Sequence, residues 1–291
     1  RLSEDPRNWV ALTALRELAT DRALMLPPAT LAAYDAALAA DSGLLAHAAN
    51  CAACAYDPAA CSLSTTLLCQ APVALTPLGD IAGLSRGAID YMQGAPVDRL
   101  DVALSAVGLG ASALIVVSGG TSATVKAGAG LTKLAHRMNL VSPRLAALIV
   151  DRAAQGIDWI ALRAVRSVDD LPAVLRAEAL APLAAIAADL GRIRDATDTA
   201  TALHLLPLID DATDARRLST ATQALGPRVT AQAEMLGKSR LLRATVRVTK
   251  TALALTAGLV GLALSLALLL ASAVQQRLYR ALLHRQDDTP N

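Results

Sequence analysis

Apolar residues recur at intervals of three and four along much of the chain, which is the spacing of a helix with one buried face. This pattern predicts helices over 9–24, from 27 to about 47, and from 169 to about 189. Strict alternation of apolar and polar residues, which is typical of a half-buried strand, is rare. We therefore expect a mostly α-helical fold.

Local signals at helix starts support this division of the chain. Ser142 precedes Pro143, which places a good N-cap residue before a proline in the first turn. The tetrapeptide Asp-Ala-Thr-Asp occurs at 195–198 and again at 211–214, and acids at a helix start interact favourably with the positive end of the helix dipole. Together with a last helix beginning near Pro227, these signals predict a bundle of four or five helices over the second half of the chain.

Two long uncharged stretches interrupt the amphipathic pattern. Residues 251–275 lie between Lys250 and Arg277 and carry no charge, and about 20 apolar residues are enough for a helix to cross the hydrocarbon core. They predict a transmembrane helix. Residues 102–125 are also uncharged, although their best part, 102–118, is only about 25 Å long as a helix. We expect a first transmembrane helix there, with a buried hydrophobic hairpin or a re-entrant segment as alternatives.

Charge is distributed unevenly around the first uncharged stretch. Residues 1–101 carry 6 basic and 11 acidic groups, whereas 126–250 carry 18 basic and 12 acidic groups. Because basic loops are retained in the cytoplasm, this predicts an extracytoplasmic helical segment at 1–101, a cytoplasmic bundle at 126–250 and an external tail at 276–291. If 102–125 does not span, the first 250 residues share one compartment and the tail is cytoplasmic.

The four cysteines lie within nineteen residues, at Cys51, Cys54, Cys61 and Cys69. A c-type haem site requires histidine after the second cysteine, where this chain has Ala55, and a zinc ribbon requires two close pairs. An even, clustered set fits two disulfides in an oxidising compartment, such as the outer side of a bacterial inner membrane. Pairing of Cys51 or Cys54 with Cys61 or Cys69 is favoured, because Cys51–Cys54 would close a very small loop.

Small residues four positions apart give the second uncharged stretch a packing face, because they allow helix backbones to approach closely in lipid. This face is formed by Ala254, Ala257, Gly258, Gly261 and Ser265. Gly108 and Ser112 show the same spacing in the first stretch. The sequence therefore predicts contacts with other membrane subunits rather than a simple anchor.

Basic residues gather just before the second uncharged stretch, with no acid after Glu234: Lys238, Arg240, Arg243, Arg247 and Lys250. Anionic lipid headgroups attract such segments by about 1 kcal/mol per basic residue. The same residues also serve as a topology signal. Aromatic residues are only 2% of the chain, so nucleic-acid binding is not indicated.

No residue pattern predicts catalysis, a cofactor or a metal. Residues 83–87 match the G-x-S-x-G pattern around Ser85, but a nucleophile elbow needs a strand before it and a helix after it, and no strand is predicted there. The four histidines are scattered. The acids of the 210–214 segment are interpreted as helix-start residues rather than as metal ligands, because acids are expected at helix starts. These acids are Asp210, Asp211 and Asp214.

These observations lead to one main functional expectation and one alternative. The main expectation is a non-catalytic accessory, structural or assembly subunit of a bacterial membrane complex, of which an energy-transducing complex is one example. Its partners would be other membrane subunits and anionic lipid. The alternative is a pore-forming or membrane-disrupting protein, because the Ala- and Gly-rich segment 102–130 lies between charged helices and could insert as a hairpin.

Overall fold

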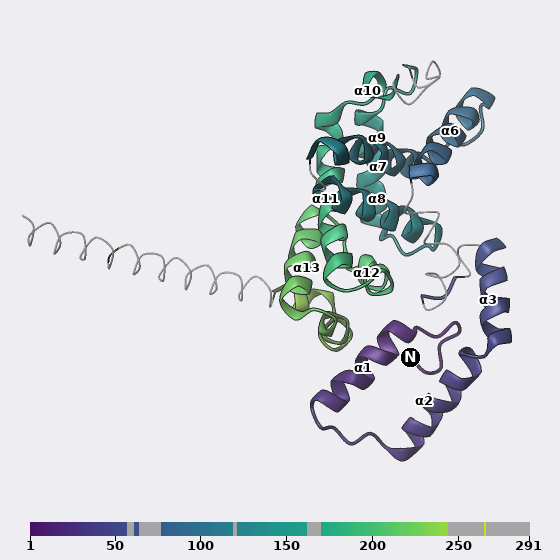
Figure 1. The fold of residues 1–291 in the computed structure, drawn as a ribbon, viewed down its shortest axis with the longest axis vertical. Coiled ribbons are helices and arrows are strands. Elements are labelled where there is room, and N and C mark those ends of the chain that lie inside the picture. The colour runs from purple at the N-terminus through teal and green to yellow at the C-terminus, as the bar shows by residue number, and fades with distance from the viewer. Residues whose placement is uncertain (57–60, 64–76, 119–120, 162–169, 244–264, 266–291) are drawn as a thin grey trace, which may run out of the picture. The chain divides into compact units, whose positions relative to one another are not determined.

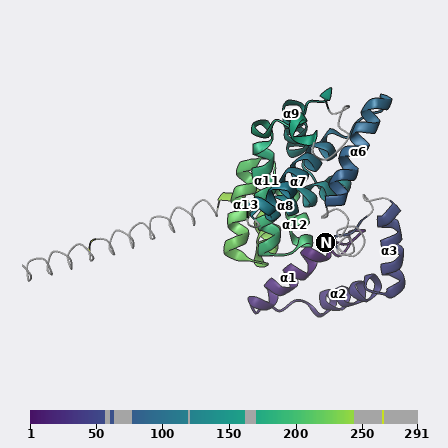
Figure 2. The ribbon, with the colours of Figure 1, turned by 45° about the horizontal axis from the view of Figure 1, so that its top comes forward.

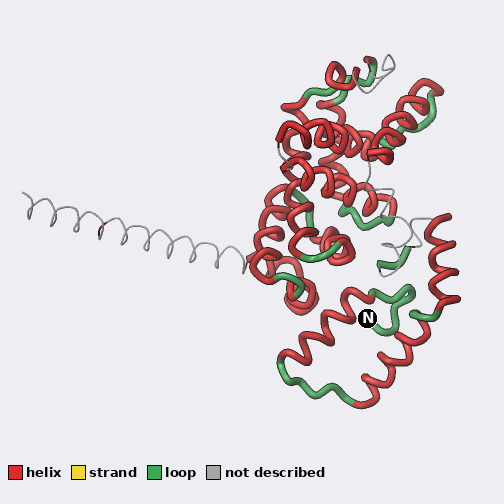
Figure 3. The backbone as a smooth tube through the Cα atoms, in the orientation of Figure 1, coloured by secondary structure: helices red, strands yellow, loops and turns green. Residues whose placement is uncertain are grey.

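The computed structural model describes residues 1–56, 61–63, 77–118, 121–161, 170–243 and 265. These residues are mostly helical and contain no strand, which confirms the predicted fold class (Figures 1 and 3). The helices are α1 (Trp9–Asp21), α2 (Pro28–Asp41), α3 (Leu44–Tyr56), α6 (Pro77–Gln93), α7 (Arg99–Ser118), α8 (Thr121–Arg137), α9 (Pro143–Gly156), α10 (Leu171–Val174), α11 (Ala177–Ala196), α12 (Thr199–Leu205), the 3-10 turn η4 (Leu206–Leu208), α13 (Ala212–Leu225) and a further helical segment, 228–243.

The core of the bundle forms where α7, α8, α9 and α11 pack together (Figures 1 and 2). Its fully buried side chains include Leu131, Leu134, Leu190 and Ile193 from α8 and α11. The apolar spacing of these helices places such residues on one face, and burying each one stabilises the fold by roughly 1.5–3 kcal/mol.

Two glycines allow α8 and α11 to approach each other closely. A Cβ atom on Gly128 of α8 would collide with the carbonyl group of Ala187, and one on Gly191 of α11 would collide with the carbonyl group of Thr124. Since the atoms in the way are backbone atoms, a change of rotamer cannot relieve the clash. The crossing therefore depends on the absence of both side chains.

Residues 102–118 belong to α7, a core helix of this bundle, and 121–125 form the start of α8, so the predicted first transmembrane span over 102–125 is not supported. Within the residues that the structure describes, no helix is long and apolar enough to cross a membrane. Residues 102–109 of α7 are all buried. A helix that is apolar on all sides fits either a membrane or the centre of a bundle, so sequence alone does not separate the two.

Residues 1–242 form one compact unit, and the rest of the chain is assigned to a second unit. Within the first unit, Asp80 from the acidic block forms ion pairs with Lys126 and Lys133 from the basic block. The two blocks, which the charge asymmetry predicted on opposite sides of a membrane, are thus in contact within one compact unit of this structure. The predicted span 251–275 and the tail 276–291 lie outside the described residues, apart from Ser265, which is helical and exposed.

Most predicted helix starts are confirmed. The Ser142 hydroxyl accepts a hydrogen bond from the Leu145 N–H at the start of α9. The two Asp-Ala-Thr-Asp sequences are used in different ways: Asp198, the last residue of the first copy, caps α12, and Asp211, the first residue of the second copy, caps α13. The helix therefore starts after the last residue of the motif in the first copy and after its first residue in the second copy.

Two predicted helices are each broken into two. The helix predicted over 27–47 ends as α2 at Asp41, and α3 begins at Leu44. The helix predicted over 169–189 is divided between α10 and α11, because Leu175 is extended and forms an isolated antiparallel bridge with Ile157. The second helix is interrupted because Leu175 pairs with Ile157, a residue distant in sequence. The local sequence pattern does not reveal such a partner.

The first two helices form a small aromatic cluster of their own. The rings of Trp9 and Tyr34 meet edge to face with centroids 5.4 Å apart, and Arg16 lies over the Tyr34 ring. The Trp9 indole N–H donates to Asp41 at the end of α2, and Arg7 forms an ion pair with the same carboxylate. This polar contact ties the end of α2 to the start of α1.

The helical segment 228–242 is connected to other helices by three sets of ion pairs. Arg228 pairs with Asp21 of α1, and Lys238 pairs with both Asp210 and Asp214 beside the start of α13. Between them, Glu234 accepts hydrogen bonds from the Arg1 guanidinium and lies 3.1 Å from Nε2 of His204 in α12.

Candidate functional site

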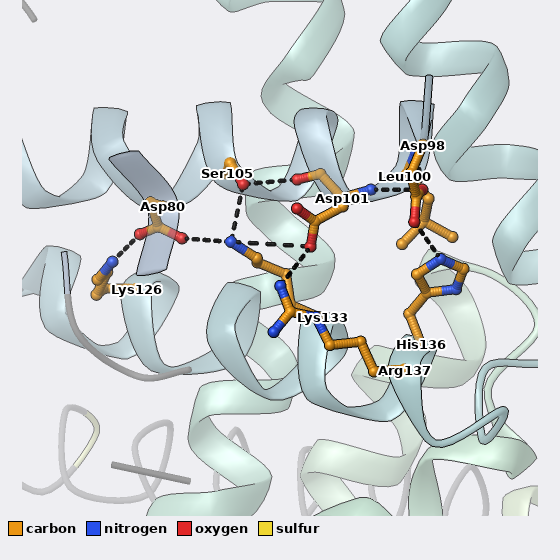
Figure 4. A network of polar contacts seen from close by, with 9 residues as sticks. All are labelled: Asp80, Asp98, Leu100, Asp101, Ser105, Lys126, Lys133, His136 and Arg137. Carbon is orange, nitrogen blue, oxygen red and sulfur yellow. Dashed lines mark hydrogen bonds and ion pairs between the residues drawn. The ribbon is translucent and has the colours of Figure 1, made fainter. Parts of the chain in front are cut away.

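The largest group of buried charges lies between α6, α7 and α8 (Figure 4). We call it the ionic cluster, and its members are Asp80 from α6, Asp101 and Ser105 from α7, and Lys126, Lys133 and Arg137 from α8. Asp80 is 0% exposed and Lys133 is 1% exposed. Charged side chains are almost never this deeply buried unless they are paired, so the arrangement of their partners decides their role.

Asp80 bridges the two lysines. Nζ of Lys133 donates to one carboxylate oxygen of Asp80 at 3.2 Å and to Oγ of Ser105 at 2.8 Å. Nζ of Lys126 donates to the other oxygen of Asp80. Lys133 also lies 3.9 Å from Asp101, which accepts a hydrogen bond from Arg137 at 3.3 Å. A single buried carboxylate therefore balances two ammonium groups, with Asp101 as the second acid.

Helical spacing brings these side chains onto facing surfaces. Asp101 and Ser105 are four residues apart on α7, and Lys126, Lys133 and Arg137 follow one another at seven and four residues on α8, so each set lies along one face. The two helices are joined by a short connection and pack along each other, which places the two faces in contact.

Two glycines make room for the carboxylates. A Cβ atom on Gly83 would collide with Oγ of Ser105 and lie 2.7 Å from Asp101, and one on Gly108 would overlap the Asp80 carboxylate. Gly108, which the sequence assigned to close helix packing, therefore does lie at a close contact, but the contact is with a buried carboxylate of α6. Ser112 also lies in α7, and its side chain is outside the described residues.

Burial lowers the pKa of Lys126 and of Lys133 to about 8, because removal from water disfavours the charged ammonium. For Lys126 the neighbouring charge of Lys133 adds to this effect. Both values remain above 7, so the two lysines are mainly protonated at neutral pH. The two lysines therefore act as charged donors, and the cluster is held by charge-assisted hydrogen bonds.

A serine and a lysine in contact can act as a nucleophile and its base, but this arrangement does not fit that chemistry. The Ser105 hydroxyl is 0% exposed and donates to the carbonyl of Asp101. Lys133 is bound to Asp80, which favours its charged form. Ser105 does not line the described cavity, so among the described residues the contact takes part in packing the interior of the bundle.

A cavity of about 140 Å³ lies beside the cluster. It is lined by Gly83, Arg86, Gly87, Asp90, Asp98, Asp101, Val102 and Arg137. Its volume is enough for several water molecules. Solvent in this cavity would meet Asp101 and Arg137, whereas Asp80, Ser105 and the two lysines are not part of its wall.

Asp98 and His136 form a more exposed pair at the edge of the cluster, with Oδ2 of Asp98 2.9 Å from Nε2 of His136. The other oxygen of Asp98 accepts hydrogen bonds from the N–H groups of Leu100 and Asp101 at the start of α7. The bond to Asp98 raises the pKa of His136, and the same bond lowers the pKa of Asp98.

This pair should stabilise the fold within a limited pH range. Its contribution is complete between about pH 4, above the ordinary Asp98 value of 3.8, and about pH 6.5, the ordinary value of His136. It is lost as pH rises through the raised pKa of His136, or falls through the lowered pKa of Asp98. NMR titration should find His136 titrating above 6.5, whereas burial lowers the pKa of His204 below that value.

The Asp98→Asn variant tests the cause. Without the carboxylate, the pKa of His136 should fall, while that of His204, which contacts Glu234, should not change. An unchanged His136 titration in Asp98→Asn would show that the hydrogen bond is not what raises the pKa.

No family model, curated protein or solved structure matches this chain. Its function therefore has to be inferred from its own geometry.

The cysteine prediction is confirmed for one pair, since Cys54 and Cys61 form a disulfide. Cys51, at the same end of α3, is also disulfide-bonded. Cys69 lies outside the described residues. The expected pairing of one close cysteine with a later one is therefore seen for Cys54.

The G-x-S-x-G sequence lies in the middle of α6, as expected for a chance match. Ser85 is exposed on the helix, and its two flanking glycines face α7. Gly83 accommodates the ionic cluster, and Gly87 accommodates the side chain of Val102. The motif reflects tight packing of two helices, and no strand-to-helix turn is present in this segment.

The acids near residue 210 have structural roles. Asp210 and Asp214 form ion pairs with Lys238, and Asp211 caps α13. Among the residues described, no group of three histidines, cysteines or acids is placed to hold a metal ion. These contacts account for all three acids.

Lys238, predicted to contact lipid headgroups, is thus already neutralised by two carboxylates. Arg240 and Arg243 are exposed on the same helical segment. Of the remaining predicted lipid and packing residues, Ser265 is the only one described, and the others lie outside the described residues: Arg247, Lys250, Ala254, Ala257, Gly258 and Gly261.

The sequence did not reveal the ionic cluster. The one available signal was the spacing of Lys126, Lys133 and Arg137 on a helix that is otherwise rich in alanine and glycine. Asp80 is 46 residues from Lys126 in sequence, so the pairing depends on tertiary structure.

Proposed function

We propose that this protein is a membrane-anchored, non-catalytic accessory or assembly subunit of a bacterial membrane complex. In this proposal residues 1–242 form a helical docking unit, and 251–275 anchor it through a helix that packs against partner subunits. The observation that carries the proposal is an uncharged stretch of 25 residues that follows a compact helical unit with only a short basic connection.

A docking role is supported by the buried charges of this unit, because they pair with one another and hold its helices together. Asp80, Lys126 and Lys133 satisfy one another, and Ser105 is buried behind them. A rigid unit of this kind can present fixed surfaces to a partner, and buried polar groups of a matched set favour one arrangement of helices over others.

The proposed location places the whole docking unit on one side of the membrane. The Cys54–Cys61 disulfide favours the extracytoplasmic side, because disulfides persist in oxidising compartments. Against this, Arg240, Arg243, Arg247 and Lys250 directly precede the uncharged stretch, and the positive-inside rule counts them toward a cytoplasmic unit. Arg277, Arg280 and Arg285 on the other side partly balance this signal, so the proposed location rests on the disulfide.

The pore-forming alternative is less well supported by the packing of α7 and α8. Insertion of this pair would carry Lys126 and Lys133 into lipid and separate them from Asp80 of α6. Each lysine at the centre of a bilayer costs about 2.5–3.5 kcal/mol on insertion scales. Conductance from the purified protein in planar bilayers would nevertheless support this alternative over an assembly role.

The anchoring and packing roles of 251–275 can be tested with two variants. Deletion of 251–275 should release the protein from alkali-washed membranes. Gly261→Ile should leave it in membranes but reduce co-purification with other subunits in mild detergent by at least fivefold, because a branched side chain separates close helix backbones. The matched control, Leu262→Ile on the leucine-rich side, should co-purify normally.

Two results would oppose the proposal. Membrane retention of the deletion variant would exclude the anchor, and recovery of the unaltered protein as a lone monomer in every mild detergent would exclude the assembly role. Reporter fusions after residues 242 and 291 would establish whether the unit and the tail lie on opposite sides.

A further inference from the structure

A second cavity, of about 570 Å³, lies where the end of α6, the connection to α7 and the residues after α9 meet. It is lined by Tyr91, Gly94, Ala95, Pro96, Val97, Arg99 and Trp159. This volume is within the 300–1,000 Å³ range of small-molecule sites, which are usually lined by apolar and aromatic groups with a few polar ones. The cavity shares no lining residue with the one beside the ionic cluster.

The aromatic lining is notable in a chain with only two tryptophans, four tyrosines and no phenylalanine. The rings of Tyr91 and Trp159 have centroids 6.3 Å apart and are tilted by 55°. They come from segments 68 residues apart in sequence, so the tertiary fold brings them together. Two tilted rings present flat apolar surface to a planar ligand.

Arg99 adds a positive charge to this wall. Its guanidinium carbon lies 5.7 Å from the centre of the Trp159 ring, which is within the range of a cation–π contact. The side chain is exposed, and no carboxylate of the described residues forms an ion pair with it. The indole nitrogen of Trp159 is itself buried, so the ring of Trp159 and not its N–H is what a ligand would meet. The exposed guanidinium of Arg99 is thus the charged donor of this wall.

We propose that this cavity binds a planar aromatic carboxylate. The ring would pack against Tyr91 and Trp159, and the carboxylate would pair with the guanidinium of Arg99, whose fork of N–H donors matches its two oxygens. The charge of Arg99 disfavours an aromatic-bound cation such as a quaternary ammonium. This inference is independent of the proposed membrane role, because every residue that carries it lies in the docking unit.

Energy transfer from tryptophan to a bound ligand provides a direct test. Trp9→Phe leaves Trp159 as the only tryptophan, and anthracene-2-carboxylate absorbs at the wavelengths where tryptophan emits. Adding this probe to the full-length protein in detergent should quench Trp159 emission in a saturable manner. Anthracene-2-carboxamide, which has the same ring without the charge, should bind at least tenfold more weakly.

Variants then assign the contacts. Arg99→Gln should weaken binding of the carboxylate at least tenfold and leave the carboxamide unchanged, and Tyr91→Ala should weaken both ligands. Arg144→Gln, which alters an arginine that is 83% exposed on α9, is the matched control and should bind normally. Partitioning of the probe into detergent is common to all variants and cancels in the comparison.

Equal affinity for the two ligands, or unchanged affinity in Arg99→Gln, would overturn the proposal, as would the absence of saturable quenching. If Trp9→Phe does not fold, because Trp9 packs on Tyr34, isothermal titration calorimetry of the unaltered chain measures the same ratios.

Discussion

Asp80→Asn is expected to lower the free energy of unfolding by about 3–5 kcal/mol, the usual loss when one partner of a buried ion pair is removed. Lys126 and Lys133 would remain buried without the carboxylate that joins them, and Asp101 alone is 3.9 Å from Lys133. Urea unfolding followed by circular dichroism measures the change. Since whole domains are stable by only about 5–15 kcal/mol, a loss of this size is readily detected.

Two further variants identify the cause of this loss. Asp80→Leu combined with Lys126→Met and Lys133→Met replaces the charges with apolar groups of similar volume and should recover most of the stability. Asp35→Asn removes the exposed partner of Arg16 and should cost less than about 1 kcal/mol. A triple variant no more stable than Asp80→Asn would contradict the view that unpaired buried charge causes the loss.

Gly128→Ala and Gly191→Ala should each destabilise the bundle by about 2–3 kcal/mol, although alanine normally favours helices. The new methyl group would meet a backbone carbonyl of the facing helix, so α8 and α11 would have to separate. The gain in helix propensity of about 0.5–1 kcal/mol is too small to offset this strain. Thermal unfolding followed by circular dichroism shows directly whether each variant is less or more stable than the unaltered protein.

Gly110→Ala provides the matched control within the same bundle. A Cβ atom at Gly110 of α7 would have no neighbour within 4 Å, so only the propensity gain remains and the variant should be more stable by about 0.5–1 kcal/mol. Destabilisation of Gly110→Ala, or stabilisation of Gly128→Ala, would show that the α8–α11 crossing tolerates a wider spacing.

The helical class and many helix starts could be predicted because they depend on local chemistry. The Ser142 cap forms within three residues, as do the caps by Asp198 and Asp211. The break at Leu175 could not be predicted, because it depends on a hydrogen-bonded partner near Ile157. Helix starts that depend on residues close in sequence were thus predicted, and a helix break that depends on a distant residue was not.

The environment of α7 shows a related limit. The part of α7 after Asp101 carries no charge, and such a stretch is compatible with lipid or with the centre of a bundle, so only its surroundings distinguish the two. Asp101 and Ser105, near its start, face lysines of α8 that lie beyond the uncharged stretch. The candidate site was missed for the same reason, because Asp80 and Lys133 become a pair only after folding.

The ion pairs along 228–242 have a mechanical consequence. Tension on the C-terminal stretch would enter the unit at this helix and be divided among contacts with α1, α12 and the start of α13, through Arg228, Glu234 and Lys238. Gly237, with its positive φ, lies between Glu234 and Lys238, so the contacts are divided between the two sides of a change in backbone direction. We therefore expect a load applied at the end of the described segment to be shared by three other parts of the same unit.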